Sequence, residues 1–121
     1  MEALSELPGY DWCGIYRLEG ENLVLDAYVG APTDHTVIPV GVGVCGTAVA
    51  TGENQVIDDV RQIENYLSCS TQTRSEIVVL IYSEGDILGQ IDIDGHSVGR
   101  FNAEDEAMLE KLAELVAARW H

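Results

Sequence analysis

The sequence predicts one α+β domain, built on a central antiparallel sheet with helices on one face and a loop-covered pocket on the other. Two pairs of apolar segments joined by glycine turns indicate two hairpins, and an amphipathic pattern near the C-terminal end indicates a helix. A long polar stretch separates the hairpins. With 121 residues, 46% of them hydrophobic, the chain is long enough for one core, so residues 1–121 are taken as a single domain.

The strand predictions rest on apolar, β-branched and aromatic runs bounded by turn residues. Residues 11–18 and 22–29 form the first predicted hairpin, and residues 77–82 and 87–94 form the second. Residues 55–57 are a short additional candidate. These segments predict an antiparallel sheet.

Two helices are expected outside the hairpins. Small residues from Cys45 onward follow a glycine-rich turn and predict a short helix that Gly52 ends as a C-cap, which places Cys45 near its N-terminus. Asn102 is the expected N-cap of the terminal helix. The apolar stripe that should pack on the sheet consists of Met108, Leu109, Leu112, Leu115 and Val116.

The remaining segments read as loops. Residues 30–39 are polar and contain proline, and residues 58–74 form a long irregular stretch. Loops of that length in a compact domain are usually functional or disordered. The long stretch is therefore where we expect functional residues.

The charge balance narrows the classes of partner. Twenty-one acidic residues face six basic ones, for a net charge of −15. Nucleic acid is excluded as a partner because its phosphates would be repelled. Dissolved cations screen such self-repulsion, so the composition suits a high-salt cytoplasm. A halophilic source is the expectation, and an acidic mesophilic protein is the alternative.

Targeting and metal-site signals are missing from the sequence. It has no run of about 18 apolar residues and no signal peptide at its start, so we expect a soluble, cytoplasmic protein without a membrane partner. Three cysteines without CxxC spacing indicate free thiols in a reducing compartment, not disulfides or a zinc site. The histidines lack metal-ligand spacing, so no metal is expected.

The three cysteines lie in different settings. Cys45, at a predicted helix N-terminus, is placed for a lowered thiol pKa, and a small buried residue is the alternative. Cys69 lies in the polar loop, where a thiol is either reactive or merely tolerated. Cys13, within an apolar strand, is most simply a core residue.

Carboxylates and aromatic residues also interrupt the apolar strands. Strand alternation puts Asp92 and Asp94 on one face, as a solvated outer face or as a pocket floor that binds a cation or ammonium group. Glu76 enters the preceding strand. Trp12 and Tyr16 are available as pocket walls, although strand aromatics are often ordinary core.

Four segments together carry a family resemblance: residues 11–16, 38–48, 74–79 and 89–94. With these segments in matching order and with matching gaps, the chain resembles the free methionine-(R)-sulfoxide reductases, which are single GAF domains, from about residue 7 to the terminal helix. The resemblance implies a GAF fold and a free amino-acid substrate.

The same resemblance implies a thiol mechanism without a bound cofactor. It gives Cys69 the role of nucleophile on the sulfoxide sulfur, and it gives Glu76 and Asp94 the role of acid or polarising groups. Asp92 becomes the ammonium anchor. A second cysteine converts the sulfenic acid to a disulfide, which a thioredoxin-type reductant opens. Trp12 and Tyr16 correspond to the aromatic walls of the substrate pocket.

Two departures from the family pattern matter. His35 stands where the usual resolving cysteine would lie, so Cys45 or an external thiol would have to act instead. The N-terminal helical region is short or missing, which leaves a homodimer open. The alternative function is a non-catalytic GAF sensor for an amino-acid-like ligand. A cyclic-nucleotide module fits less well, because acidic residues repel phosphate.

Overall fold

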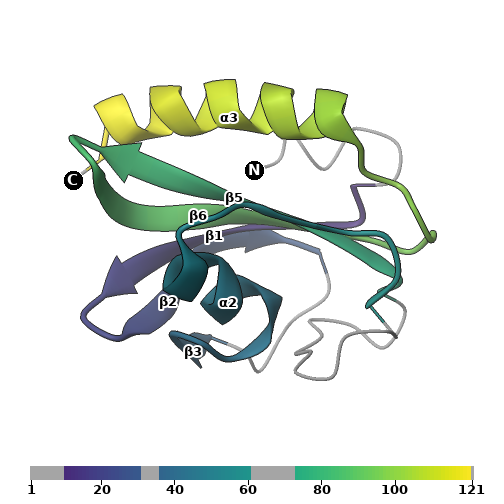
Figure 1. Ribbon diagram of the computed structural model, residues 1–121, viewed down its shortest axis with the longest axis horizontal. Helices are drawn as coiled ribbons and strands as arrows, with labels where there is room; N and C mark the ends of the chain where they lie inside the picture. The colour runs from purple at the N-terminus through teal and green to yellow at the C-terminus, as the bar shows by residue number, and fades with distance from the viewer. Residues whose placement is uncertain (1–9, 31–35, 61–72, 121) are drawn as a thin grey trace.

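A computed structural model of the chain describes residues 10–30, 36–60 and 73–120. Within these residues, six strands form one antiparallel sheet in the order β3-β2-β1-β6-β5-β4, and two helices flank it (Figure 1). The predicted α+β class is confirmed. The elements are β1 (Trp12–Glu19), β2 (Asn22–Val29), β3 (Val37–Pro39), α2 (Gly43–Thr51), β4 (Gln55–Ile57), β5 (Ser75–Ser83), β6 (Asp86–Gly95) and α3 (Ala103–Ala118).

Both predicted hairpins are present, and their inner strands join them. β1 pairs with β2, β5 pairs with β6, and β1 pairs with β6 at the centre of the sheet. β4 has the predicted bounds and lies at one edge, beside β5. β3, at the other edge, was not predicted, because three residues show no alternation and Pro39 argues against a strand. Proline is tolerated there because an edge strand does not need every donor.

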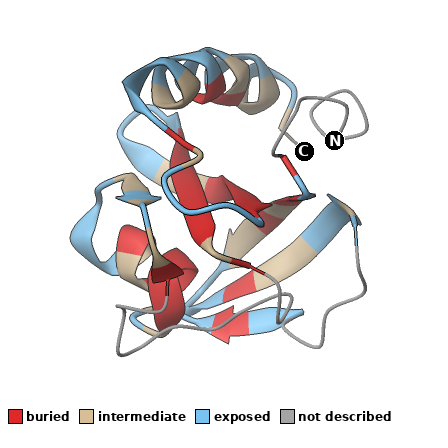
Figure 2. Cartoon of the chain, turned by 90° about the vertical axis from the view of Figure 1, so that its right-hand side faces the viewer, coloured by how far each residue is buried: buried red, intermediate tan, exposed pale blue. Residues whose placement is uncertain are grey.

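The sheet separates two apolar clusters. The first lies under α3 and includes Ile77, Ile91 and Ile93, with Leu109 from the helix. The second lies under α2 and includes Val78. The predicted packing of α3 on the sheet is therefore confirmed. Helix α2, which was expected on the same face as α3, lies on the opposite face, as Figure 1 shows. Buried residues follow the central strands between the helices (Figure 2).

Helix α3 begins as predicted at Asn102. Its side chain accepts hydrogen bonds from the backbone N–H groups of Glu104 and Asp105, and the Asp105 carboxylate accepts one from the Asn102 N–H. Leu109 and Ala113 are buried against the sheet. Within residues 10–30, 36–60 and 73–120, no helix is long and apolar enough to cross a bilayer.

The predicted apolar stripe of α3 is partly wrong. Met108 and Leu115 are 37% and 66% exposed. The helix contacts the sheet along a narrower line through Leu109 and Ala113, so residues on its flanks project beyond the contact. Leu115 instead lines a surface groove of about 450 Å³ beside Trp120.

Candidate functional site

Three rows of residues cross β5, β6 and β1 on the face that carries α2. Cross-strand partners share a face of a sheet, so the side chains of each row project toward the same helix. The predicted carboxylates and aromatic walls thereby converge from separate hairpins. The rows are Glu76–Asp94–Trp12, Val78–Asp92–Gly14 and Leu80–Gln90–Tyr16.

Helix α2 brings Cys45 over these rows. Cys45 is the third residue of the helix and is buried. The next residue, Gly46, lets the helix approach the turn after β3 closely, because a Cβ atom there would lie 2.5 Å from the carbonyl oxygen of Pro39. The backbone N–H of Gly41 donates to the carbonyl of Gly46 at 2.9 Å. The predicted position of Cys45 near a helix N-terminus is confirmed.

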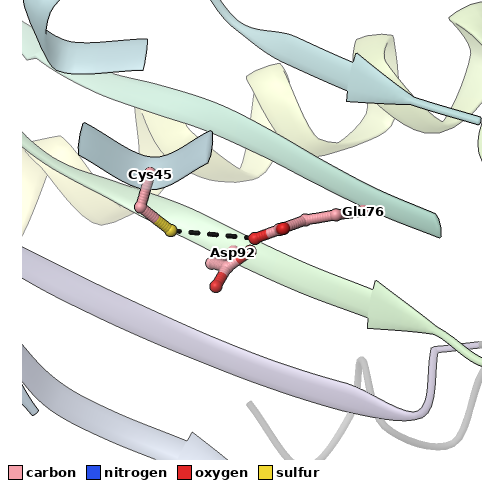
Figure 3. A group of neighbouring side chains, drawn as sticks. All are labelled: Cys45, Glu76 and Asp92. Atoms are coloured by element: carbon pink, nitrogen blue, oxygen red, sulfur yellow. Dashed lines mark hydrogen bonds between the residues drawn. The ribbon is translucent and has the colours of Figure 1, made fainter. Parts of the chain in front are cut away.

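Cys45 meets two of the predicted carboxylates. Its Sγ donates a hydrogen bond to Oε2 of Glu76 over 3.7 Å. Sγ of Cys45 and one oxygen each of Glu76 and Asp92 all lie within 4.8 Å of one another (Figure 3). One thiol and two carboxyl groups therefore share a buried site built from α2, β5 and β6.

Asp92 has the most unusual environment of the three. It is 1% exposed, and neither carboxyl oxygen has a hydrogen-bond partner of ordinary length among the described residues. Burial raises the pKa of Asp92, while the nearby Glu76 and Cys45 side chains oppose that shift. The carboxyl group therefore keeps its proton to higher pH than an exposed aspartate, and a cationic ligand would favour its ionised form.

The burial of Asp92 and Asp94 decides between the two interpretations of this strand face. Both side chains are 1% exposed. The solvated outer face is therefore wrong, and the pocket-floor interpretation remains. The predicted common face of the two aspartates is confirmed, with Ile91 and Ile93 buried on the opposite side.

Aromatic side chains border the carboxylates. The indole of Trp12 lies over Gly14, where a Cβ atom would come within 2.4 Å of the ring. Tyr28 stacks on Trp12 with ring centroids 5.7 Å apart and an interplanar angle of 16°. Tyr16 is fully buried in the same cluster. The site thus combines acidic groups with polarisable apolar walls, which suits a small cationic ligand with an apolar end.

Comparison with known proteins identifies the fold family. The family model of the GAF domain matches residues 1–120. The chain belongs to the GAF domain family.

Several relatives of this GAF domain are named free methionine-R-sulfoxide reductase, so the predicted resemblance is confirmed. The one from Escherichia coli is 42% identical over 89% of the chain, and the one from Saccharomyces cerevisiae is 39% identical over 88%. The chain spans 65% and 61% of the lengths of these two relatives. It therefore corresponds to somewhat less than two thirds of either protein.

Solved structures agree with the sequence relatives. A type II free methionine-R-sulfoxide reductase from Thermoplasma acidophilum superimposes with a TM-score of 0.93 and 43% identity, covering 97% of this chain and 84% of the other. The enzyme from Neisseria meningitidis, solved in complex with its substrate, has a TM-score of 0.92 and 36% identity, covering 98% and 71%. The GAF fold predicted from the resemblance is confirmed.

The GAF domain buries a further polar residue that sequence reasoning did not assign. Gln90 lies in the same face as Asp92, is fully buried, and has no hydrogen-bond partner for its amide within the described part of the chain. Its spacing of two residues from Asp92 was the available signal. The amide is a second unsatisfied polar group beside the candidate site.

Cys13 is a core residue of the GAF domain, as predicted. It is fully buried in the cluster under α3, and its Sγ donates to the carbonyl of Tyr10 over 3.9 Å. Burial raises its thiol pKa to about 12. Cys13 therefore lies on the opposite face of the sheet from Cys45.

Two residues that matter to the predicted mechanism lie outside the described part of the GAF domain. They are the predicted nucleophile Cys69 and His35, which stands at the position of the usual resolving cysteine. Their predicted roles therefore rest on the sequence.

Proposed function

We propose that this GAF domain reduces free L-methionine-(R)-sulfoxide to methionine. The observation that carries the proposal is the buried group of Cys45, Glu76 and Asp92 on the face that also carries Trp12. Relatives and structural neighbours named for this reaction support it. The substrate is a small molecule, and the reaction needs no bound cofactor because thiols supply its electrons.

The charge of the site favours a free amino acid. Asp92 is the proposed anchor for the substrate ammonium group, because a buried carboxylate is stabilised by a cation that satisfies its oxygens. Methionine sulfoxide within a peptide chain has no α-ammonium group to offer. Trp12 and Tyr16 are the proposed walls around the methyl end. Discrimination between the free and the peptide-bound substrate follows from this anchor.

The proposed chemistry transfers one oxygen atom from sulfur to sulfur. The thiolate of Cys69 attacks the sulfoxide sulfur, the oxygen moves to Cys69 as a sulfenic acid, and methionine leaves as the reduced thioether. Glu76 and Asp94, both buried, are the proposed groups that polarise or protonate the sulfoxide oxygen. A protonated carboxyl group beside the sulfoxide oxygen would supply the proton that such a step requires.

Cys45 is the proposed resolving thiol. It would attack the sulfenic acid of Cys69, releasing water and forming a disulfide, and a thioredoxin-type dithiol would then reduce that disulfide. Glu76, which accepts the Cys45 hydrogen bond, is placed to take the thiol proton. Bond formation requires Cα atoms within about 7 Å. Direct reduction of the sulfenic acid by an external thiol is the alternative.

Methionine formation from the free sulfoxide tests the proposal. We expect turnover with dithiothreitol and with thioredoxin, loss of both in Cys69→Ser, and loss with thioredoxin alone in Cys45→Ser. Cys13→Ala, on the opposite face, is the matched control and should retain turnover. N-acetylmethionine sulfoxide should be a poor substrate because it lacks the ammonium group. Turnover that survives in Cys69→Ser would contradict the mechanism.

A non-catalytic sensor for an amino-acid-like ligand is the second candidate. His35 at the usual resolving position favours it. A putative GAF sensor protein from Burkholderia vietnamiensis is 34% identical over 92% of this chain, with a TM-score of 0.85. Saturable binding of methionine or its sulfoxide by calorimetry, without turnover by any reductant, would identify the sensor.

Assembly and working conditions complete the proposal. We infer a cytoplasmic protein adapted to high salt from the net charge of −15, because concentrated cations screen repulsion between carboxylates. Molar salt should then increase far-ultraviolet circular dichroism, and a decrease would overturn the inference. The resemblance leaves a homodimer open, and sedimentation at the working salt concentration decides between a monomer and a dimer.

A further inference from the structure

We propose that Cys45, Glu76 and Asp92 bind a thiophilic divalent cation, with Zn²⁺ as the preferred ion. We propose further that the bound ion inhibits the reaction at this site. The inhibition half of the proposal rests on the proposed reductase function. The binding half rests on the geometry of the site alone.

The three side chains have a geometry close to that of a metal site. Their ligand atoms lie within 4.8 Å of one another and come from α2, β5 and β6 (Figure 3). With metal–ligand bonds of about 2.0 to 2.3 Å, tetrahedral Zn²⁺ requires one thiolate sulfur and two carboxylate oxygens to lie roughly 3.3 to 3.5 Å apart. The ligand atoms would have to approach one another by up to about 1.5 Å on binding. A water molecule would complete the coordination.

The state of Asp92 is an independent indication of a ligand. Both of its oxygens are buried and lack a hydrogen-bond partner of ordinary length within the described residues. An unsatisfied buried carboxyl group costs free energy that a coordinated cation recovers. Figure 3 shows the Asp92 side chain beside the hydrogen bond that joins Cys45 to Glu76. One Asp92 oxygen lies within 4.8 Å of both other candidate ligand atoms, Sγ of Cys45 and an oxygen of Glu76.

The donor set selects the kind of cation. A thiolate is a soft ligand that favours Zn²⁺, Co²⁺ or Cd²⁺, whereas Mg²⁺ prefers oxygen ligands and retains its waters. Binding releases the Cys45 proton and any proton held by the two carboxyl groups, with no change of oxidation state. Affinity should therefore rise with pH. The strongly acidic surface adds a general attraction for cations, which Mg²⁺ shares.

Occupancy by Zn²⁺ would have two consequences for the proposed reaction. Asp92 would no longer be available to the substrate ammonium group, so the metal would compete with methionine sulfoxide. Cys45 would be held as a metal thiolate and would not attack a sulfenic acid. Zn²⁺ would thus act as a reversible inhibitor of the reduced protein, and a chelator would restore turnover.

Co²⁺ is the probe for the binding test, because a thiolate ligand gives it a charge-transfer band in the near ultraviolet. The reduced protein is titrated with Co²⁺ in excess Mg²⁺, which occupies weak carboxylate sites. We expect one equivalent to bind, Zn²⁺ to displace it, and Cys45→Ser to abolish the band. Asp92→Asn and Glu76→Gln should weaken binding at least 10-fold, because even outer-shell partners contribute 10- to 100-fold. Cys13→Ala, on the opposite face of the sheet, should keep the band.

The possible results separate the two proposals. A band that survives in Cys45→Ser, or that Mg²⁺ abolishes, would overturn the metal site. Circular dichroism of each variant identifies loss of folding, and Glu76→Gln serves as the second test where Asp92→Asn fails to fold. An intact band without any reductase turnover would refute the enzyme and retain the site. Turnover that is unaffected by saturating Zn²⁺ would refute the proposed inhibition.

Discussion

The two faces of strand β6 are buried to the same degree and have opposite chemistry. Ile91 and Ile93 pack under α3 with other aliphatic side chains, and both are fully buried. Gln90, Asp92 and Asp94 project from the same strand toward α2, and none is more than 1% exposed. Burial alone therefore does not distinguish a core from a site. The distinction lies in the buried groups of Gln90 and Asp92, which have no hydrogen-bond partner of ordinary length among the described residues.

This difference assigns stability to one face and ligand binding to the other. Burial of aliphatic surface under α3 contributes roughly 25 cal/mol for each Å² removed from water. Under α2, an unsatisfied buried polar group costs about 1 to 3 kcal/mol. A ligand that supplies the missing partner recovers that free energy as affinity. We therefore expect substitutions on the two faces to have opposite effects.

The largest expected effect is that of Ile93→Ala, which should destabilise the fold by about 2 to 5 kcal/mol. Ile93 is fully buried between the two aspartates but faces α3, so its truncation leaves a cavity in the aliphatic core. Ligand affinity of the folded fraction should change little. Urea denaturation measures the stability, and calorimetry at low temperature measures the binding.

The half-exposed Val98 provides the control for this comparison. Val98→Ala should stay within about 0.5 kcal/mol of the parent protein. If Ile93→Ala abolished binding while remaining folded, the separation of the two faces would be wrong.

Gly14→Ala should destabilise the protein by about 1 to 3 kcal/mol through overpacking. The added methyl group would lie 2.4 Å from the Trp12 indole, so the ring would have to move from the wall of the site. We expect a shift in tryptophan emission and weaker ligand binding together. The same substitution in a Trp12→Leu background should cost less, and equal costs in the two backgrounds would show that the ring does not cause the strain.

Asp92→Asn should stabilise the protein at alkaline pH while weakening ligand binding. Burial raises the pKa of folded Asp92, so between the unfolded and folded pKa values the native state holds more protons. The free energy of unfolding of the parent therefore falls as pH rises through that interval. Asparagine has no proton to lose, so the variant keeps this part of its free energy of unfolding. The resulting difference between variant and parent is about 1.4 kcal/mol for each unit by which the folded pKa exceeds the unfolded pKa.

Thermal unfolding of parent and variant at pH 3 and pH 8 measures the effect of Asp92→Asn. The advantage of the variant should be small at pH 3, where the parent carboxyl is protonated in both states, and larger at pH 8. An advantage that is equal at the two pH values would show that ionisation of Asp92 is not responsible. Destabilisation at pH 8 would show that the carboxylate is stabilised in the native site.

Much of the scaffold was predictable because its signals are local. Turn residues and alternation predicted both hairpins, and the C-cap at Gly52 and the N-cap at Asn102 follow from short-range hydrogen bonds. Strand β3 was not predicted because a three-residue edge strand is defined by its pairing with the neighbouring strand β2 and not by its own sequence pattern. Leu115 was assigned to the buried stripe because helical periodicity gives a direction but not the width of the surface that the helix meets.

The candidate site was predictable in part. Alternation placed Asp92 and Asp94 on one face, but the sequence left open whether water or protein covers that face. The contact of Cys45 with Glu76 joins residues 31 positions apart and depends on how closely α2 approaches the sheet. Gln90 went unassigned because a single buried amide in a strand has no distinctive pattern.

The sequence by itself determined the two hairpins, the helix caps, and the side of β6 on which each residue lies, because neighbours along the chain decide all of these. Only the tertiary structure decided that the acidic side is buried, and that one thiol and two carboxyl groups meet there. The physical reason is that the pKa of Asp92 and its affinity for a cation depend on which atoms exclude water from it, and these belong to distant segments.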